Sequence, residues 1–356
     1  MEPIVIQTPA GSRAIGPGHP VFVIAEMSGN HGGDLDRARA LVDAAVDAGV
    51  DAIKLQTYTP DTMTIDCANE YFQVKSNDAW RGKSLYELYR WAHTPWEWQP
   101  GLKEHAERRG VLLFSTPFDH TSVDFLERMN VALYKVASFE SGDIPLLRKI
   151  GSTRKPVIMS RGMSSLAATE LAAATLREAG APQVAVLHCV SAYPARAEDM
   201  NLATIPDLAA RTGMIVGLSD HTLGTTVAIA SVALGASIIE KHFTLDRSEG
   251  GPDAGFSLEP AELAQLMREV RIAESALGAP RYEVIEREAE NVIFRRSIFV
   301  VEDVRQGEPL TARNTRIIRP GNGLEPREYD RVLGSTAARD LVRGTPLAWE
   351  HVRERS

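Results

Sequence analysis

The sequence predicts a (β/α)₈ barrel followed by a small β-rich domain. Short apolar runs typical of buried parallel strands alternate with amphipathic helices, giving eight strand–helix units over roughly 260 residues. Barrels of this class typically need about 250 residues. Polar side chains follow nearly every predicted strand, where such barrels carry their active sites. An open, doubly wound sheet is the structural alternative.

The predicted elements follow one another in a regular order. A hairpin formed by residues 3–9 and 13–15 comes first, and we expect it to cover one end of the barrel. The predicted strands span residues 21–26, 52–56, 111–115, 133–137, 156–160, 184–189, 214–218 and 237–240. The predicted helices span residues 34–49, 121–129, 143–150, 164–179, 205–211, 223–235 and 260–277.

A long excursion from Thr57 to about Trp91 interrupts this alternation. An insertion of this length after a strand often carries function. It leads into an aromatic cluster made of Tyr86, Tyr89, Trp91, Trp96 and Trp98. The alternative interpretation of these rings is a packed aromatic mini-core.

The composition excludes several classes of protein. The chain has 356 residues and a net charge of −8, which argues against a nucleic acid or an anionic membrane as the main partner. No apolar run is long enough to cross a membrane. The two cysteines, Cys67 and Cys189, lie far apart, so we expect reduced thiols and a cytoplasmic location. CxxC, P-loop and GxGxxG motifs are absent from the sequence, so a zinc ribbon, a Walker-type NTPase and a Rossmann dehydrogenase have no support.

Two histidines follow the last two predicted strands. His221 comes after the strand 214–218 and His242 after the strand 237–240. Because adjacent parallel strands end at the same rim, we expect the two imidazoles to lie close together. Two neutral imidazoles can hold a divalent cation, and a site of nitrogen and oxygen ligands suits Mn²⁺, Co²⁺ or Mg²⁺ better than structural zinc. Hydrogen-bonded histidines without a metal are the alternative.

Two lysines lie inside predicted buried strands. Lys54 and Lys135 are both near the carboxyl end of their strand, where an unpaired ammonium group would be costly to bury. Hydroxyl groups from Thr116 and Ser160 follow neighbouring strands. Ammonium and hydroxyl groups together are what a phosphate or carboxylate needs, so we expect a bound anion. A solvated barrel rim is the alternative.

The C-terminal part of the chain, from residue 278 onward, differs in sequence pattern from the predicted barrel. Residues 278–296 are charged and lack a clear apolar face, which indicates a linker. In the tail, DVRQGEPL (303–310) recurs as DLVRGTPL (340–347), which predicts a small pseudo-symmetric β-rich domain over 297–356. Between the two repeats lies a glycine-rich loop with Arg319, which could reach an anionic substrate or could be a solvated loop residue.

With these residues assembled, the chain resembles the sialic acid synthase family from about Val21 to Leu347. The segments that carry the resemblance are IAEMSGNHGG, KLQTYTPDTMT, HTPWEW, FSTPFD, YKVASFE, SAYPA, GLSDHTLG, IIEKHFTL, FSLEP and RPGNGL. It implies a (β/α)₈ barrel over 1–277, a linker over 278–296 and an antifreeze-like (SAF) domain over 297–356. It also implies a domain-swapped homodimer, in which the small domain of one subunit covers the barrel mouth of the other.

The resemblance assigns roles to individual residues. It makes His221 and His242 the metal ligands, with Mn²⁺ or a similar ion. It places around phosphoenolpyruvate the residues Lys54, Thr116, Lys135, Ser138, Ser160 and Ser219. It places near the metal or the acceptor sugar the residues Glu26, Gln56, Glu140, Tyr193 and Asp253, with Arg319 reaching the sugar from the partner subunit. Arg161 and Val190 depart from the threonines usual in the family, which puts substrate contacts beside them in doubt.

The resemblance implies a metal-dependent condensation of phosphoenolpyruvate with an open-chain N-acetylated amino sugar, releasing phosphate. Glu26, Lys54, His221 and His242 are the expected catalytic residues, with Glu26 steering water or a proton. YTPDTMT and HTPWEW favour the pseudaminic branch over the neuraminic one. A synthase acting on N-acetylmannosamine or a legionaminic precursor stays open. So do a metal hydrolase on the same fold and a carbohydrate-binding protein without enzymatic activity.

Overall fold

The computed structural model describes residues 1–74 and 82–354. Its central feature is a closed barrel of parallel strands in the order β10-β3-β4-β5-β6-β7-β8-β9. The strands are β3 Phe22–Glu26, β4 Ala52–Thr57, β5 Leu112–Pro117, β6 Tyr134–Val136, β7 Val157–Arg161, β8 Val184–Cys189, β9 Ile215–Asp220 and β10 Ile238–His242. The closed order confirms the predicted (β/α)₈ barrel and contradicts the open-sheet alternative.

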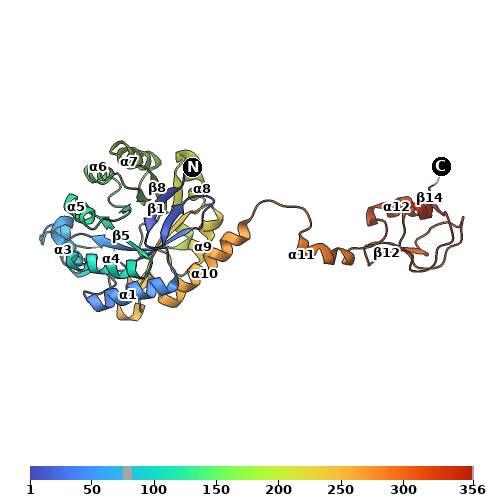
Figure 1. Cartoon of the computed structure of the whole chain (residues 1–356), viewed down its shortest axis with the longest axis horizontal. Helices are drawn as coiled ribbons and strands as arrows, with labels where there is room; N and C mark the ends of the chain where they lie inside the picture. Colours follow the sequence, from blue (N-terminus) through green and yellow to red (C-terminus); the bar gives the residue numbers. More distant parts are fainter. Residues whose placement is uncertain (75–81, 355–356) are drawn as a thin grey trace. The chain divides into compact units, whose positions relative to one another are not determined.

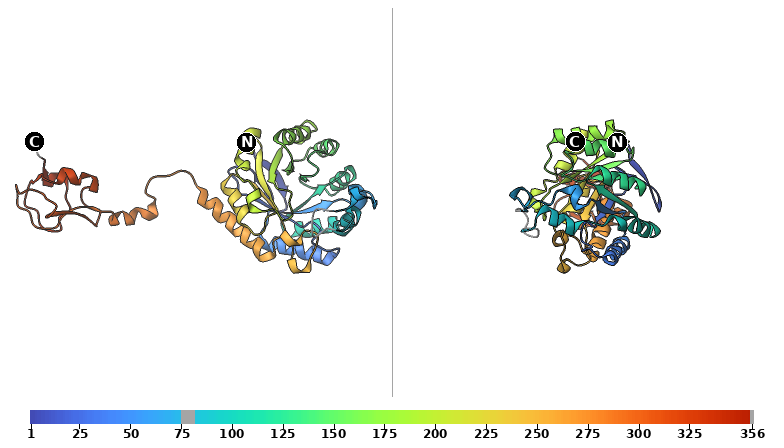
Figure 2. Two further views of the ribbon diagram at one scale, coloured as in Figure 1. Left: turned by 180° about the vertical axis from the view of Figure 1, so that it is seen from behind. Right: turned by 90° about the vertical axis from the view of Figure 1, so that its left-hand side faces the viewer.

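Helices form the layer outside the barrel, around the strands (Figures 1 and 2). They are α1 Leu35–Ala48, α4 Gln99–Arg108, α5 His120–Arg128, α6 Ile144–Gly151, α7 Leu166–Glu178, α8 Thr204–Thr212, α9 Thr226–Ala233 and α10 Pro260–Leu277. The Asp34 side chain caps α1 by accepting from the N–H groups of Asp36 and Arg37. Helix α9 begins three residues later than predicted, because Gly224 adopts a left-handed conformation (φ 71°) just before it and leaves Leu223 exposed.

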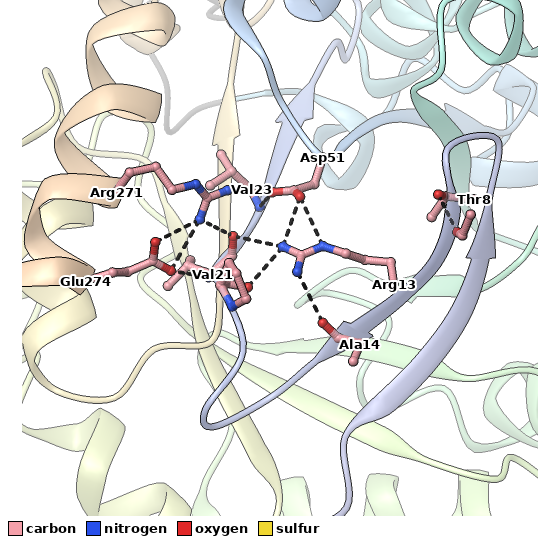
Figure 3. A network of polar contacts seen from close by, with 10 residues as sticks. Thr8, Arg13, Ala14, Val21, Val23, Asp51, Arg271 and Glu274 are labelled. Carbon is pink, nitrogen blue, oxygen red and sulfur yellow. Dashed lines mark hydrogen bonds and ion pairs between the residues drawn. The ribbon is translucent and has the colours of Figure 1, made fainter. Parts of the chain in front are cut away.

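The predicted hairpin is confirmed as β1 Ile4–Thr8 paired with β2 Gly11–Ile15. Ile4, Ile6 and Ile15 are buried in one hydrophobic core with barrel residues such as Ile215, so the hairpin covers the N-terminal end of the barrel. A polar network joins it to the strands and to α10 (Figure 3). At its centre is Asp51, between Arg13 of the hairpin and Arg271 of α10.

The excursion after β4 contains three short helical segments and α3 in its described parts. These are α2 Pro60–Met63, η1 Glu70–Phe72, α3 Leu85–Ala92 and η2 Trp96–Trp98. Residues 75–81 of the predicted excursion lie outside the described residues. Three rings of the aromatic stretch contact different partners, so these three do not pack on one another as a mini-core would require. Tyr89 packs on Tyr58, whereas Trp96 packs on Phe125 and Trp98 on His31.

The chain divides into two compact units, Met1–Gly278 and Ala279–Ser356. The described strands of the second unit are β11 Ser297–Val300, β12 Thr315–Ile318, β13 Thr336–Ala337 and β14 Val352–Arg353. Its helical segments are α11 Glu286–Ala289, η6 Glu290–Phe294, η7 Pro326–Glu328, α12 Tyr329–Val332 and η8 Trp349–His351. In the first unit, 3₁₀ turns η3 Ala197–Asp199, η4 Arg247–Glu249 and η5 Ala254–Phe256 lie in loops after strands. The segment 278–296, predicted as a linker, therefore carries two helical turns.

The sequence repeat in the tail corresponds to a symmetric exchange of hydrogen bonds. Val304 and Leu341, equivalent in the two copies, pair as an antiparallel bridge. The Asp303 carboxylate accepts from the Arg343 N–H, and the Asp340 carboxylate accepts from the Gln306 N–H, both at 2.7 Å. Each copy thus stabilises the turn of the other, and the predicted pseudo-symmetry is confirmed.

No helix in the described parts of the chain is long and apolar enough to cross a lipid bilayer.

Candidate active site

Strand alternation directs polar side chains into the barrel mouth. On β10 the side chains of Glu240 and His242 lie on one face, and on β9 Ser219 shares its face with His221 just beyond the strand. The residues between them lie on the opposite face, where Lys241 donates to Asp220 at 2.8 Å inside the barrel wall. The ends of β9 and β10 therefore supply both a structural ion pair on one face and site residues on the other.

The carboxyl ends of the strands open into a cavity of about 460 Å³. The predicted site residues that line it are Lys54, Gln56, Lys135, Ser138, Glu140, Ser160, Tyr193, Ser219, His221, His242 and Asp253. Glu26 and Thr116 do not line the cavity but contact the Lys54 ammonium group. Arg319 belongs to the second unit and is not among the lining residues. The sequence therefore predicted most of one physical cavity.

Each buried lysine is held by a carboxylate and a hydroxyl group. Lys54 Nζ lies 2.5 Å from Glu26 Oε2 and 3.2 Å from Thr116 Oγ1. Lys135 Nζ donates to Ser160 Oγ at 2.7 Å. Both lysines are almost fully buried, at 4% and 2% exposure. Their ammonium groups are thus fixed side by side at the floor of the cavity, where they can bind an anion.

The sequence analysis missed Glu240, which lies between the two lysines. Its Oε1 is 3.8 Å from Lys54 Nζ and 3.6 Å from Lys135 Nζ, and it accepts from Ser219 Oγ at 3.3 Å. Its other oxygen, Oε2, is buried without a hydrogen-bond partner among the described residues. The signal was present in IIEKH, because Glu240 is two residues before His242 and must share its face of the strand.

Burial and ion pairing shift the pKa values of this cluster in different directions. Burial would lower the pKa of Lys54, but Glu240 and Glu26 outweigh it and raise the value. Burial prevails for Lys135, whose pKa is lowered despite Glu240. Burial also raises the pKa of Glu26, whereas the two lysines hold that of Glu240 below its ordinary value. An anion bound beside Lys135 would favour its charged form.

A hydroxyl pair beside Lys135 was also missed in part. Ser138 Oγ and Ser191 Oγ lie 2.8 Å apart, and only the first was predicted. Gly162 lies against both, since a Cβ there would be 2.1 Å from Ser191 Oγ. A glycine at position 162 therefore leaves room for the two serine side chains where they meet.

The two histidines meet as predicted. The His221 and His242 ring centroids are 5.3 Å apart. His221 Nδ1 lies 2.9 Å from the carbonyl oxygen of Val190, so donation to that oxygen leaves the lone pair on Nε2. His242 Nδ1 is buried without a hydrogen bond to any residue that the structure describes, and it lies 3.5 Å from Asp253 Oδ2. Burial and the neighbouring His221 hold the pKa of His242 well below its ordinary value, so its imidazole is neutral.

These imidazoles fit a divalent cation on two observations. A neutral ring with an unpartnered buried nitrogen is a suitable ligand, and a carbonyl that orients the second ring is a common feature around metal-binding histidines. Within residues 1–74 and 82–354 there is no group of three or more His, Cys, Asp or Glu side chains arranged to hold a metal ion. A cation held by His221 and His242 would take its other ligands from water or substrate.

Carboxyl and aromatic groups surround the histidines. Asp253 accepts a 2.5 Å hydrogen bond from Ser28, and Gln56 donates to Glu26 at 2.9 Å. The Tyr193 ring lies 4.4 Å from that of His221. Glu140 follows β6, which is not adjacent to β9 or β10, and lines the cavity elsewhere on the rim. One of its oxygens has no hydrogen-bond partner in the described part of the chain, and burial raises its pKa to about 7, so it can exchange a proton with a ligand.

The two departures from the family pattern have separate explanations. The main chain of Val190, rather than its side chain, meets His221, and the side chain packs against the barrel core. Arg161 donates to the carbonyl oxygen of Ser164 at 2.7 Å and is not among the residues that line the cavity. Neither side chain is thus a direct part of the cavity.

Comparison with known proteins places this barrel in a family. The model of the NeuB family matches residues 41–282, and that of the SAF domain matches residues 295–353. The chain belongs to the NeuB family. The predicted sialic acid synthase resemblance and the predicted SAF domain are therefore confirmed, and with them the prediction of an enzyme.

Named relatives align over nearly the whole chain. A pseudaminic acid synthase of Campylobacter jejuni is 41% identical over 327 residues, which cover 92% of this chain and 95% of that protein. The pseudaminic acid synthase of Helicobacter pylori is 38% identical over 338 residues, covering 95% and 99%. A crystal structure of the N-acetylneuraminic acid (sialic acid) synthetase of Leptospira borgpetersenii is similar with a TM-score of 0.70 and 35% identity, covering 79% of this chain and 93% of that one.

Proposed function

We propose that this protein is a pseudaminic acid synthase, which condenses phosphoenolpyruvate with 2,4-diacetamido-2,4,6-trideoxy-L-altrose and releases phosphate. The observation that carries the proposal is the pair of buried lysines beside two imidazoles in one cavity. A pair of ammonium groups suits a substrate with a phosphate and a carboxylate. The 41% and 38% identities to pseudaminic acid synthases favour this member of the family.

The lysines and hydroxyl groups bind phosphoenolpyruvate in this proposal. Lys54 and Lys135 neutralise its phosphate and carboxylate, with Ser160 and Thr116 holding the two ammonium groups in position. Ser138 and Ser219 add hydroxyl donors from neighbouring strand ends. The ammonium charges matter most when the bond from C2 to the phosphate oxygen breaks and negative charge develops on phosphate.

The histidine side of the cavity receives the acceptor. A divalent cation on His221 and His242, with Mn²⁺ expected and Co²⁺ or Mg²⁺ as alternatives, would polarise the aldehyde of the open-chain sugar. Carbon C3 of phosphoenolpyruvate attacks that aldehyde carbon, and water then adds at C2. Glu26 accepts a hydrogen bond from Gln56 and pairs with Lys54, and through these two side chains it steers the water or the proton.

Gln56, Glu140, Tyr193 and Asp253 orient the sugar in this proposal. Each of the four lines the cavity next to the histidines or the lysines. Arg319 reaches the sugar from the partner subunit of a domain-swapped homodimer, as the family resemblance implies. In this proposal the positively charged side chain of Arg319 comes from the other subunit, whereas the remaining groups belong to one barrel. Activity therefore depends on the dimer.

An acceptor panel tests the function. Phosphate release is measured with phosphoenolpyruvate and Mn²⁺, against the altrose sugar, its legionaminic counterpart and N-acetylmannosamine, with product masses recorded. The proposal expects turnover with the altrose sugar and loss of turnover when EDTA removes the metal. Preference for another sugar would instead identify an N-acetylneuraminate or legionaminate synthase.

Two further outcomes would contradict a synthase of any kind. Sugar binding that EDTA does not affect, without phosphate release, would indicate a carbohydrate-binding protein. Hydrolysis of a sugar in the absence of phosphoenolpyruvate would indicate a metal hydrolase on the same fold.

A further inference from the structure

The cavity has two chemically different sides. Its floor, at the strand ends, carries the lysines, hydroxyl groups and histidines. Among the described residues, the lining contributed by the excursion after β4 and by Phe118 is mainly apolar, with Tyr58, Gln73 and Tyr89 as its polar members. We call the larger apolar side chains of this lining the apolar wall, and they are Met63, Val74, Leu85, Leu88 and Phe118.

The apolar wall is built mainly by the excursion after β4. Met63 ends α2, and Leu85 and Leu88 belong to α3. An antiparallel bridge between Gln73 and Ser84 brings the two helices together, and Tyr86 Oη donates to Asp61 at 3.2 Å across them. The described parts of the excursion are thus folded into a defined surface.

Aromatic side chains fix the wall against the barrel. The Tyr58 ring makes edge-to-face contacts with Tyr89 at 5.7 Å and with Phe118 at 5.2 Å. The Tyr58 carbonyl oxygen accepts from Trp96 Nε1 at 3.0 Å. Tyr58 itself is only 3% exposed. The wall is therefore positioned by packing before any ligand binds.

We infer that the apolar wall is the specificity element for the acceptor, binding methyl groups at the end of the sugar far from its aldehyde. This inference rests on the proposed function. The aldehyde has to lie at the polar floor, beside the histidines and lysines, so the other end of the sugar faces the wall. The wall contains no hydrogen-bond donor or acceptor in its side chains other than the weakly accepting sulfur of Met63.

Such a surface distinguishes a deoxy sugar from a hydroxylated one. Contact with the apolar wall removes a C6 methyl group or an acetamido methyl group from water, which lowers the free energy of binding. A 6-hydroxyl group would give up hydrogen bonds to water and find no partner among these five side chains. Pockets of this kind discriminate by roughly 10- to 100-fold. The apolar wall therefore favours the 6-deoxy end of the proposed acceptor over a hydroxylated one.

The test compares two acceptors in the full-length protein. They are the 6-deoxy diacetamido sugar and its 6-hydroxy analogue, each assayed for phosphate release with phosphoenolpyruvate and Mn²⁺. The double variant Met63→Gln/Leu85→Gln makes the wall polar at nearly constant volume. Leu171→Gln is the matched control, because Leu171 is exposed on α7 and outside the cavity.

We expect wild type and the control to prefer the 6-deoxy sugar by about tenfold or more in kcat/KM. The double variant should reduce this preference at least about fivefold, while the KM for phosphoenolpyruvate stays within about twofold. A thermal melt verifies folding. Should the double variant fail to fold, Val74→Thr, which adds a hydroxyl group without changing shape, is tested in the same way and should also lower the preference.

The contradicting outcomes are distinct. Turnover with both sugars and an unchanged preference in a folded wall variant would overturn the role of the wall and leave the proposed function intact. Absence of phosphate release by wild type with any acceptor would overturn the proposed function and, with it, this inference.

Discussion

The two ends of the barrel both concentrate charged side chains, but they pair them differently. At the N-terminal end, both carboxylate oxygens of Asp51 are fully used (Figure 3). Oδ1 accepts from Arg13 at 2.9 Å, and Oδ2 accepts from the Val23 N–H at 2.9 Å and from Arg271 at 3.2 Å. At the C-terminal end, Glu240 Oε2 and His242 Nδ1 are buried with no hydrogen bond among the described residues.

This difference separates a structural network from a functional one. A half-buried carboxylate with every oxygen hydrogen-bonded, such as that of Asp51, can stabilise a unique arrangement of the elements that it joins. A buried polar atom without a partner costs free energy in the folded state, so it requires another explanation, such as a ligand. The two ends therefore differ in whether their buried polar atoms have hydrogen-bond partners, and not in the types of residue that they contain.

The largest effect is expected at the C-terminal end. His242→Ala removes one of the two proposed metal ligands and should reduce kcat/KM for the acceptor by at least about 10³-fold, since metal polarisation contributes several kcal/mol. The midpoint of thermal unfolding should change little, because the ring lines the cavity and its Nδ1 makes no hydrogen bond within the described residues. Bound Mn²⁺, phosphate release and a thermal melt are measured. His19→Ala, at an exposed position, is the control, and retained metal binding in His242→Ala would contradict the assignment.

At the N-terminal end the opposite pattern is expected. Asp51→Asn leaves the partly exposed Arg13 and Arg271 without their shared carboxylate and should lower the free energy of unfolding by about 1–2 kcal/mol. Turnover at 25 °C should stay near the wild-type value, because Asp51 lies away from the cavity lining. Urea unfolding and the phosphate assay check this, with the exposed Asp36→Asn as control. Lost turnover in folded Asp51→Asn would show that the two ends are not separable.

A smaller effect concerns pH. Burial raises the pKa of Glu140 from 4.5 to about 7, so the folded state retains a proton that the unfolded state releases between these values. The resulting stability is fully present below about pH 4.5 and is lost as the pH rises through 7. Glu140→Gln cannot lose this proton. The thermal midpoint of wild type should therefore fall relative to that of the variant by a few degrees between pH 5 and pH 8.

Thermal melts at a series of pH values measure this difference. Glu178→Gln, at an exposed position of α7, should follow wild type throughout. Parallel pH profiles for wild type and Glu140→Gln would show that Glu140 ionises at its ordinary pKa.

The sequence predicted the barrel and most of its lining because both follow from local patterns. Alternation along strands places Lys54, Lys135 and the two histidines toward the interior, and strand ends of a parallel barrel converge. The face on which Glu240 lies could be read from IIEKH, but its role depends on distances to two lysines from other strands. These distances appear only after the barrel has closed.

The apolar wall could not be predicted from the sequence for a related reason. Met63 and Leu85 are brought together by the Gln73–Ser84 bridge, a contact that the sequence pattern did not indicate. The contacts of the aromatic stretch could not be predicted either, because its residues lie on two helical segments, α3 and η2, and face several directions. Each ring then packs with whichever neighbour its direction meets, as with Tyr58 for Tyr89 and Phe125 for Trp96.

Binding of phosphoenolpyruvate tests most directly whether the C-terminal charges form a binding site. Isothermal titration calorimetry in the presence of Mn²⁺ compares wild type with Lys135→Met and with the control Lys155→Met. Lys135 lines the cavity at 2% exposure, whereas Lys155 pairs with Glu127 outside it at 2.6 Å. We expect wild type and Lys155→Met to bind phosphoenolpyruvate equally, and Lys135→Met to bind it at least about 100-fold more weakly. Equal binding by all three proteins would contradict the account.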